Sequence, residues 1–182
     1  MLGMLSLPAE SALRRIAAVE TRTTYPELAV LRVPSIVESY VDDLLDILSA
    51  EYVKGDSDFQ WSLQAVTDEK LHQNWNTRRE WLRDAFHIDV GKTAEAQDFF
   101  LLVELRNALV HGGDGLTRSQ RRRLRGQLAL ERDLRKRLNA FVDGQRTILT
   151  DATARAAVQV GSRYVRALDT VAREELVRRE LL

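Results

Sequence analysis

The sequence predicts an all-α fold, a bundle of about five main helices in one domain. Apolar residues recur at helical spacing in several long segments, and the 182-residue chain contains only three prolines and nine glycines. The connections between these segments are short, which favours antiparallel neighbouring helices. We expect an N-terminal helix and connection over residues 1–34, the main helical domain over residues 35–175 and a tail over residues 176–182.

Composition argues against several classes of protein. Lys plus Arg and Asp plus Glu number 27 each, and this zero net charge disfavours nucleic-acid binding by bulk charge alone. The chain has no cysteine, which excludes disulfides and zinc-thiolate sites. It shows no acidic calcium loop and no phosphate-binding glycine loop, so we expect neither a metal nor a cofactor. Without a long apolar run or a signal-peptide pattern, we expect a cytoplasmic protein with no membrane partner.

The first segments are a helix and a proline-punctuated connection. A helix is predicted over residues 8–21, because Pro8 suits a first turn and apolar residues follow at helical spacing. Residues 21–34 contain Pro26 and Pro34 and are predicted to be a connection with at most one helical turn.

The next helix is predicted from a capping pattern. Ser35-Ile-Val-Glu38 matches the capping box, in which the first and fourth side chains each bond the other's backbone N–H. A helix is therefore expected from Ser35 to about Val53. Residues 59–66 are ambiguous and compatible with a short helix.

Two threonines are expected to start the following helices. Thr67 can cap a helix over residues 68–86, and Thr93 can cap the central helix. The central helix contains the most apolar run of the chain, residues 98–111, and its length and lack of turn residues favour helix over strand. Gly112 is expected to close it in the left-handed conformation that glycine adopts without a Cβ penalty.

The last third of the chain is predicted to form two helices. Thr117-Arg-Ser-Gln120 is a second capping-box pattern, and the helix it opens is expected to be basic at first and apolar as far as Phe141. Residues 144–150 alternate in character and are compatible with a short extended link. The last residue of this link, Thr150, or Asp151 after it, is expected to cap the final helix.

The central helix carries a polar seam on an otherwise apolar surface. Phe100, Glu104, Asn107 and His111 share one stripe, and Arg106 lies on the neighbouring stripe. A helix that is apolar nearly all round is normally buried, and polar groups on it cost free energy unless they are paired. The seam is therefore either a satisfied structural network or a functional site.

The segment Arg106-Asn107-Ala-Leu-Val-His111-Gly resembles the Arg-Asn-x-x-x-His motif of the HEPN superfamily (higher eukaryotes and prokaryotes nucleotide-binding). The resemblance extends loosely over residues 35–175 and implies a HEPN-like helical bundle. It also implies a metal-independent endoribonuclease, a toxin or phage-defence effector, with Arg106, Asn107 and His111 as catalytic residues. The implied partners are a second copy of the chain, which completes the cleft, an RNA substrate, and a cognate antitoxin or regulatory protein.

The chemistry of these residue types suits RNA cleavage. Histidine transfers protons near neutral pH, and the planar arginine fork binds phosphate oxygens at two points. The nucleophile is the ribose 2′-OH, so the expected products carry a 2′,3′-cyclic phosphate or a 3′-phosphate and a free 5′-OH. Arg106 and His111 lie about 140° apart around an ideal helix, whereas Asn107 and His111 stack at i and i+4. Asn107 is therefore expected to orient the imidazole.

Further residues are candidates for supporting roles. Glu104 is expected to hold Arg106 or His111, and Glu38 can reach the site from the facing helix unless it serves the capping box. The arginines after the motif are candidates for binding RNA phosphates, with a solvated helix face as the alternative; they are Arg118, Arg121, Arg122 and Arg125. The apolar stripe beside Arg106 faces either a second subunit or another helix of the same chain; it contains Phe99, Val103 and Val110.

The competing function is a non-catalytic HEPN helical module that binds a nucleotide, RNA or a partner protein. In that case the motif is structural, and replacing His111 lowers the melting temperature rather than an activity. A toxin that is silenced by nucleotidylation of a tyrosine or another hydroxyl overlaps with the nuclease hypothesis.

Overall fold

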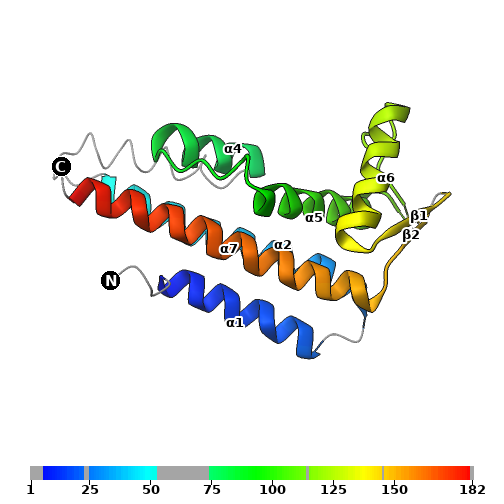
Figure 1. The fold of residues 1–182 in the computed structure, drawn as a ribbon, viewed down its shortest axis with the longest axis horizontal. Coiled ribbons are helices and arrows are strands. Elements are labelled where there is room, and N and C mark those ends of the chain that lie inside the picture. Colours follow the sequence, from blue (N-terminus) through cyan, green and yellow to red (C-terminus); the bar gives the residue numbers. More distant parts are fainter. Residues whose placement is uncertain (1–5, 23–24, 53–73, 114, 145, 181–182) are drawn as a thin grey trace.

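The described part of the chain is mainly helical in the computed structural model, which confirms the predicted all-α class (Figure 1). The structure describes residues 6–22, 25–52, 74–113, 115–144 and 146–180. The helices are α1 Leu7–Arg22, α2 Pro26–Tyr52, α4 Trp75–Glu80 with the π-helical turn Trp81–Ala85, α5 Ala94–His111, α6 Leu124–Leu138 and α7 Asp151–Glu180. A small hairpin of two strands, β1 Phe141–Asp143 and β2 Arg146–Ile148, lies between α6 and α7.

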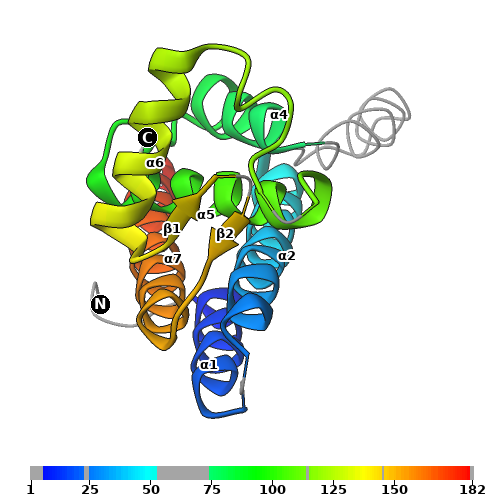
Figure 2. The same cartoon turned by 90° about the vertical axis from the view of Figure 1, so that its right-hand side faces the viewer.

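Three long helices form the main layer, and α5 lies across it. α1, α2 and α7 pack against one another along the length of the molecule, and α5 packs against both α2 and α7. α6 projects from one end of this bundle, and the hairpin lies at the same end (Figure 2). The predicted segment boundary at residue 34 falls inside α2, and the predicted tail is the end of α7 as far as Glu180.

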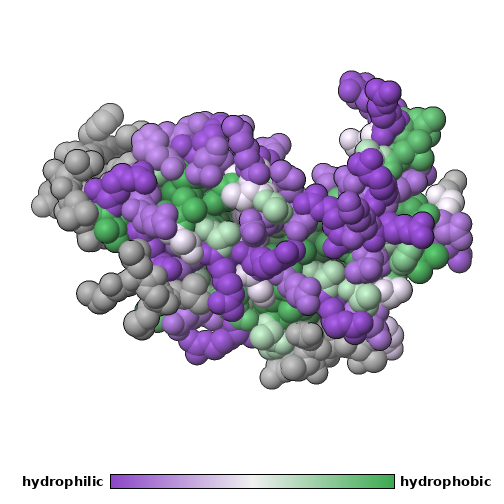
Figure 3. Space-filling model, in the orientation of Figure 1, coloured by the Kyte–Doolittle hydropathy of each residue, from purple (hydrophilic) through white to green (hydrophobic). Residues whose placement is uncertain are grey.

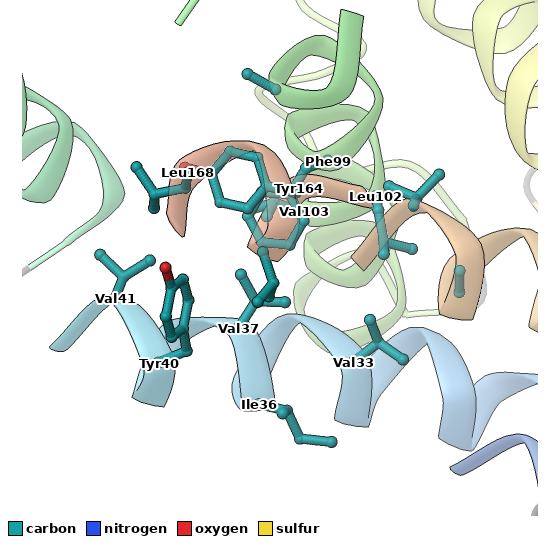
Figure 4. Close-up of a cluster of buried hydrophobic side chains, with 14 of the residues drawn as sticks. Val33, Ile36, Val37, Tyr40, Val41, Phe99, Leu102, Val103, Tyr164 and Leu168 are labelled. Carbon is teal, nitrogen blue, oxygen red and sulfur yellow. The ribbon is translucent and has the colours of Figure 1, made fainter. Parts of the chain in front are cut away.

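The core is where α2, α5 and α7 meet. The rings of Phe99 on α5 and Tyr164 on α7 stack with centroids 4.3 Å apart, and both face side chains of α2 such as Val37 (Figure 4). Both rings are almost completely buried. Burial raises the pKa of the Tyr164 phenol, against the nearby charge of Arg79, so Tyr164 remains neutral over the physiological pH range.

A buried polar cluster ties the start of α1 to α7. The Ser6 backbone N–H donates to Asp169 Oδ2 at 3.2 Å, its hydroxyl donates to Oδ1, and Arg173 Nε pairs with Oδ2 at 3.0 Å. Asp169 also acts on Tyr40 of α2. Burial is the main cause that raises the pKa of the Tyr40 phenol, and the negative charge of Asp169 is the second. The cluster keeps a fully buried carboxylate paired, as its charge requires.

The predicted connection over residues 21–34 is wrong in its second half. α2 begins at Pro26 and passes through Pro34 without a break. The capping box at Ser35 does not form, because the Ser35 hydroxyl donates to the Leu31 carbonyl 3.2 Å away inside the same helix. A proline costs about 3 kcal/mol inside a helix. Burial of Val30 and Val33 on the core face offsets this cost, so tertiary packing overrides the local signal.

The predicted helix over residues 68–86 is shorter than expected. Asn74 has an extended backbone, and its side chain accepts a hydrogen bond from the Thr77 N–H at 3.0 Å, so α4 begins at Trp75. The predicted cap Thr67 and the ambiguous residues 59–66 lie outside the described residues.

The later helix boundaries follow the predicted caps in part. Thr93 caps α5 by accepting from the Ala96 N–H, and Thr150, rather than Asp151, caps α7 by exchanging hydrogen bonds with Thr153. α6 ends at Leu138, because Asn139 adopts the left-handed conformation with φ 53°. Phe141 therefore lies on β1 rather than on the helix, and it pairs with Ile148 of β2.

A buried arginine fixes α4 to α2. Arg78 Nε and Nη2 donate to the two carboxylate oxygens of Asp42 at 2.7 and 3.0 Å, and Nη1 contacts Glu38 Oε1 at 3.1 Å. The Arg78 side chain is only 5 % exposed. Glu38 is therefore committed to this network, which is neither of the roles predicted for it.

We expect Arg78→Met to lower the free energy of unfolding by about 3 kcal/mol, because it leaves two neighbouring carboxylates without their buried cation. The matched control is Arg83→Met, which removes an arginine from an exposed ion pair with Asp84 and should leave stability unchanged. Urea unfolding of both variants is the measurement. Equal urea midpoints for Arg78→Met and the parent chain would contradict the stabilising role of the ion pairs that Arg78 makes with Asp42 and Glu38.

Candidate functional site at the end of α5

The predicted motif occupies the last turns of α5. Arg106 and Asn107 are half-buried, and Arg106 Nη1 donates to Asn107 Oδ1 at 3.3 Å. His111 is the last residue of the helix and is exposed. Among the described residues, no hydrogen bond joins the His111 side chain to the side chain of Arg106 or Asn107. The structure thus brings two of the three residues together and leaves the imidazole on the surface, about one turn further on.

Two of the predicted supporting contacts are not made among the described residues. Asn107 bonds Arg106 rather than orienting His111. Glu104, which was expected to hold Arg106 or His111, accepts from Gln120 instead: Gln120 Nε2 lies 2.7 Å from Glu104 Oε2 and 2.9 Å from the Glu104 carbonyl oxygen. Gln120 thereby holds the segment after the motif against α5.

The glycine loop turns the chain sharply after His111. Gly112 has a right-handed backbone with φ −91°, and the left-handed residue is Gly113 with φ 69°, so the predicted conformation occurs one position later. A Cβ on Gly112 would lie 1.8 Å from the Gly115 carbonyl oxygen. Glycine is therefore required at position 112 by a close approach of the backbone rather than by a positive φ.

The predicted capping box forms after the loop, but the residues that follow Thr117 make a turn rather than the start of a helix. The Thr117 N–H donates to Gln120 Oε1 at 2.8 Å, and the Gln120 N–H donates to Thr117 Oγ1 at 3.2 Å. α6 begins later, after Arg123. All four predicted phosphate-binding arginines are exposed here, and they are Arg118, Arg121, Arg122 and Arg125. Hydrophilic side chains, bordered by apolar ones, cover the projecting end of α6 (Figure 3).

The stripe beside Arg106 faces mainly its own chain. Phe99 and Val103 are buried in the core of the monomer. Val110 is 47 % exposed and remains available to a second subunit. A homodimer stays a prediction. Of the three residues in this stripe, only Val110 has enough exposed surface to contact a second subunit.

A groove of about 610 Å³ lies beside the motif, between α4, α5 and α6. Asn107 and Glu104 line it from α5, Trp75 and Arg79 from α4, and Arg137 from α6. Arg106 and His111 are not among its lining residues. The α4 residues of this groove could not be predicted from the sequence, because they carry no motif and reach α5 only through the docking of α4.

Among the described residues, no group of three or more histidine, aspartate or glutamate side chains is arranged to hold a metal ion. None of the described helices is long and apolar enough to cross a membrane. Comparison of the chain with protein-family models, with curated proteins and with solved structures gave no match.

Proposed function

We propose that this chain is a metal-independent endoribonuclease of HEPN type that cleaves RNA through attack by the ribose 2′-OH. The observation that supports this most is the arrangement at the end of α5, where Arg106 and Asn107 are in contact and His111 is accessible to solvent. Exposed arginines follow directly in the sequence. The biological role as a toxin or phage-defence effector, with an antitoxin or regulatory protein as partner, rests on the resemblance of the motif.

The reaction assigns each residue a role that fits its chemistry. A base removes the proton of the 2′-OH, the 2′-oxygen forms a bond to phosphorus, and the bond from phosphorus to the 5′-oxygen breaks. An acid returns a proton to that leaving oxygen. His111 is suited to proton transfer because imidazole titrates near neutral pH. The Arg106 guanidinium, positioned by Asn107, is suited to hold the phosphate oxygens as negative charge develops on them.

A second copy of the chain completes this proposed site. One imidazole cannot be both base and acid at opposite sides of the phosphorus in the same step, and the motif supplies one histidine per chain. In a homodimer, two copies of His111 and Arg106 would line one cleft. The exposed Val110 beside the motif is available for such a contact.

The exposed arginines after the motif are proposed to bind the RNA backbone. Lysine and arginine side chains that neutralise phosphates give nucleic-acid binding that weakens as salt rises. Arg118 and Arg121 flank Gln120, which is bonded to Glu104 of α5, so this basic segment is held close to the motif. The proposed RNA binding therefore depends on local positive charge, because the chain as a whole has zero net charge.

A non-catalytic helical module that binds RNA, a nucleotide or a protein is the second candidate. It is favoured by the absence, among the described residues, of a side-chain hydrogen bond between His111 and the rest of the motif. It is also favoured by the groove, which Asn107 lines and which the other two motif residues do not line.

Digestion of single-stranded RNA by the purified chain tests the proposal. We expect cleavage at the same rate in excess EDTA and in Mg²⁺, because no metal takes part. A DNA strand of the same sequence should stay intact, since it lacks the 2′-OH. Loss of RNA cleavage on chelation, or cleavage of the DNA strand, would contradict the proposed reaction.

A further inference from the structure

We infer that the groove between α4, α5 and α6 binds an unpaired nucleobase of the RNA. This inference rests on the proposed function and adds to it a site that holds one unpaired base of the RNA. It also assigns a role to residues of α4 that lie outside the motif.

The groove has aromatic walls suited to stacking. Trp75 and Phe100 both line it, are half-buried, and lie edge to face with ring centroids 5.9 Å apart. The Arg79 guanidinium lies over the Phe100 ring, 4.5 Å from its centroid. Proteins bind unpaired bases by stacking them on aromatic rings and on guanidinium planes. Because Arg79 covers one face of Phe100, we expect a base to stack on the guanidinium plane, beside the Trp75 ring.

The charges of the groove favour a neutral ligand over a phosphate. Arg79 and Arg137 line it together with Glu104 and Asp133, so the cations and anions balance. Arg137 is also paired with Asp98 on α5. A phosphate needs uncompensated positive charge, and the exposed arginines after the motif supply that elsewhere. A base is uncharged at neutral pH and loses little by entering a groove of zero net charge.

The polar groups of the groove match the edges of a base. Asn76, Gln97 and Asn107 contribute carboxamides, each with an NH₂ donor and a carbonyl acceptor. Watson–Crick edges carry donors and acceptors at the same spacing, and specific RNA binding reads these edges in unpaired bases. In a duplex the edges are occupied and the faces are stacked, so a helix cannot present them to this groove.

The position of the groove connects it to the proposed chemistry. Asn107 lines the groove and accepts a hydrogen bond from Arg106, so a base held here brings its own backbone towards the Arg106 guanidinium. Glu104 at the same edge bonds Gln120 within the arginine segment. A single strand can therefore run from the groove to the arginines along one side of α5.

Binding measurements on an inactive chain test the inference without cleavage. All chains in this test carry His111→Asn, and the chain with this change alone is the parent for the comparison. The probes are fluorescently labelled oligo(A), oligo(C) and oligo(U), with an RNA duplex of equal length. We expect the single strand of the preferred base to bind at least about tenfold more tightly than the duplex. Adding Asn76→Ala and Gln97→Ala, two exposed residues, should weaken that binding by about tenfold, as expected for loss of two hydrogen bonds. The loss should persist at higher salt.

Gln159→Ala is the matched control, because it removes an exposed carboxamide from α7, away from the groove. Its binding should equal that of the parent. The inference is overturned if the groove variant binds the single strand as the parent does, if it loses no more affinity than the control, or if duplex and single strand bind equally. Failure of the proposed nuclease is separate, because it appears as absence of cleavage by the unmodified chain whatever the affinity.

Discussion

Replacing His111 with asparagine is expected to reduce the rate of RNA cleavage by about 10²- to 10⁴-fold while the melting temperature stays unchanged. The rate falls because asparagine cannot exchange a proton near neutral pH, and general acid–base catalysis contributes a factor of this size. Stability is kept because the His111 side chain is exposed at the end of α5 and makes no hydrogen bond among the described residues. Cleavage of a labelled single strand and a thermal melt are the two measurements.

The matched control is a second exposed histidine. His87 lies between α4 and α5 with φ 58°, a left-handed conformation that asparagine tolerates, so His87→Asn removes an imidazole without straining the chain. Its cleavage rate should equal that of the parent. Equal cleavage by His111→Asn would contradict the catalytic role, and a lower melting temperature without any parent activity would favour the non-catalytic module.

Replacing Arg106 with alanine is expected to reduce cleavage by about 10²- to 10³-fold. The guanidinium is assigned to the phosphate as charge develops there, and loss of one such donor group has an effect of this size. Arg106→Lys should recover only part of the rate, because an ammonium cannot bind two phosphate oxygens in one plane. A merely structural charge would be replaced by lysine without loss.

The control for Arg106 is Arg166→Ala, which removes an exposed arginine from α7. It changes the net charge by the same amount and should leave cleavage unchanged. If Arg106→Ala and Arg166→Ala reduce the rate equally, the effect belongs to the overall charge of the chain and the assignment of Arg106 fails. Urea midpoints close to that of the parent would show that neither variant acts through unfolding.

Helices with strong local signals could be predicted from the sequence. Thr93 and Thr150 act as caps because a hydroxyl before a helical run bonds the free N–H groups of the first turn. Pro34 shows the limit of such signals. Its local preference is to interrupt a helix, but burial of Val30 and Val33 keeps α2 continuous, and that burial depends on α2 packing against the rest of the bundle.

The candidate site could be predicted only where one helix carries it. Arg106 and Asn107 are neighbours on α5, and the structure brings their side chains together, whereas His111 lies one turn further on and its imidazole stays on the surface. Glu104 was assigned the wrong neighbour because its partner Gln120 is 16 residues away and arrives by the fold of the loop. Trp75 and Arg79 join the groove because Arg78 docks α4 onto α2, and no pattern in the sequence reports that contact.

The chemistry of the RNA ends made by the unmodified chain in excess EDTA tests the central claim most directly. The account predicts 2′,3′-cyclic phosphate or 3′-phosphate ends together with 5′-hydroxyl ends, because the 2′-oxygen attacks and the 5′-oxygen leaves. Mass spectrometry of a short labelled strand distinguishes these ends by mass. Products with 5′-phosphate ends, or an RNA strand left intact by the folded chain, would contradict the assignment of Arg106 and His111 to RNA cleavage.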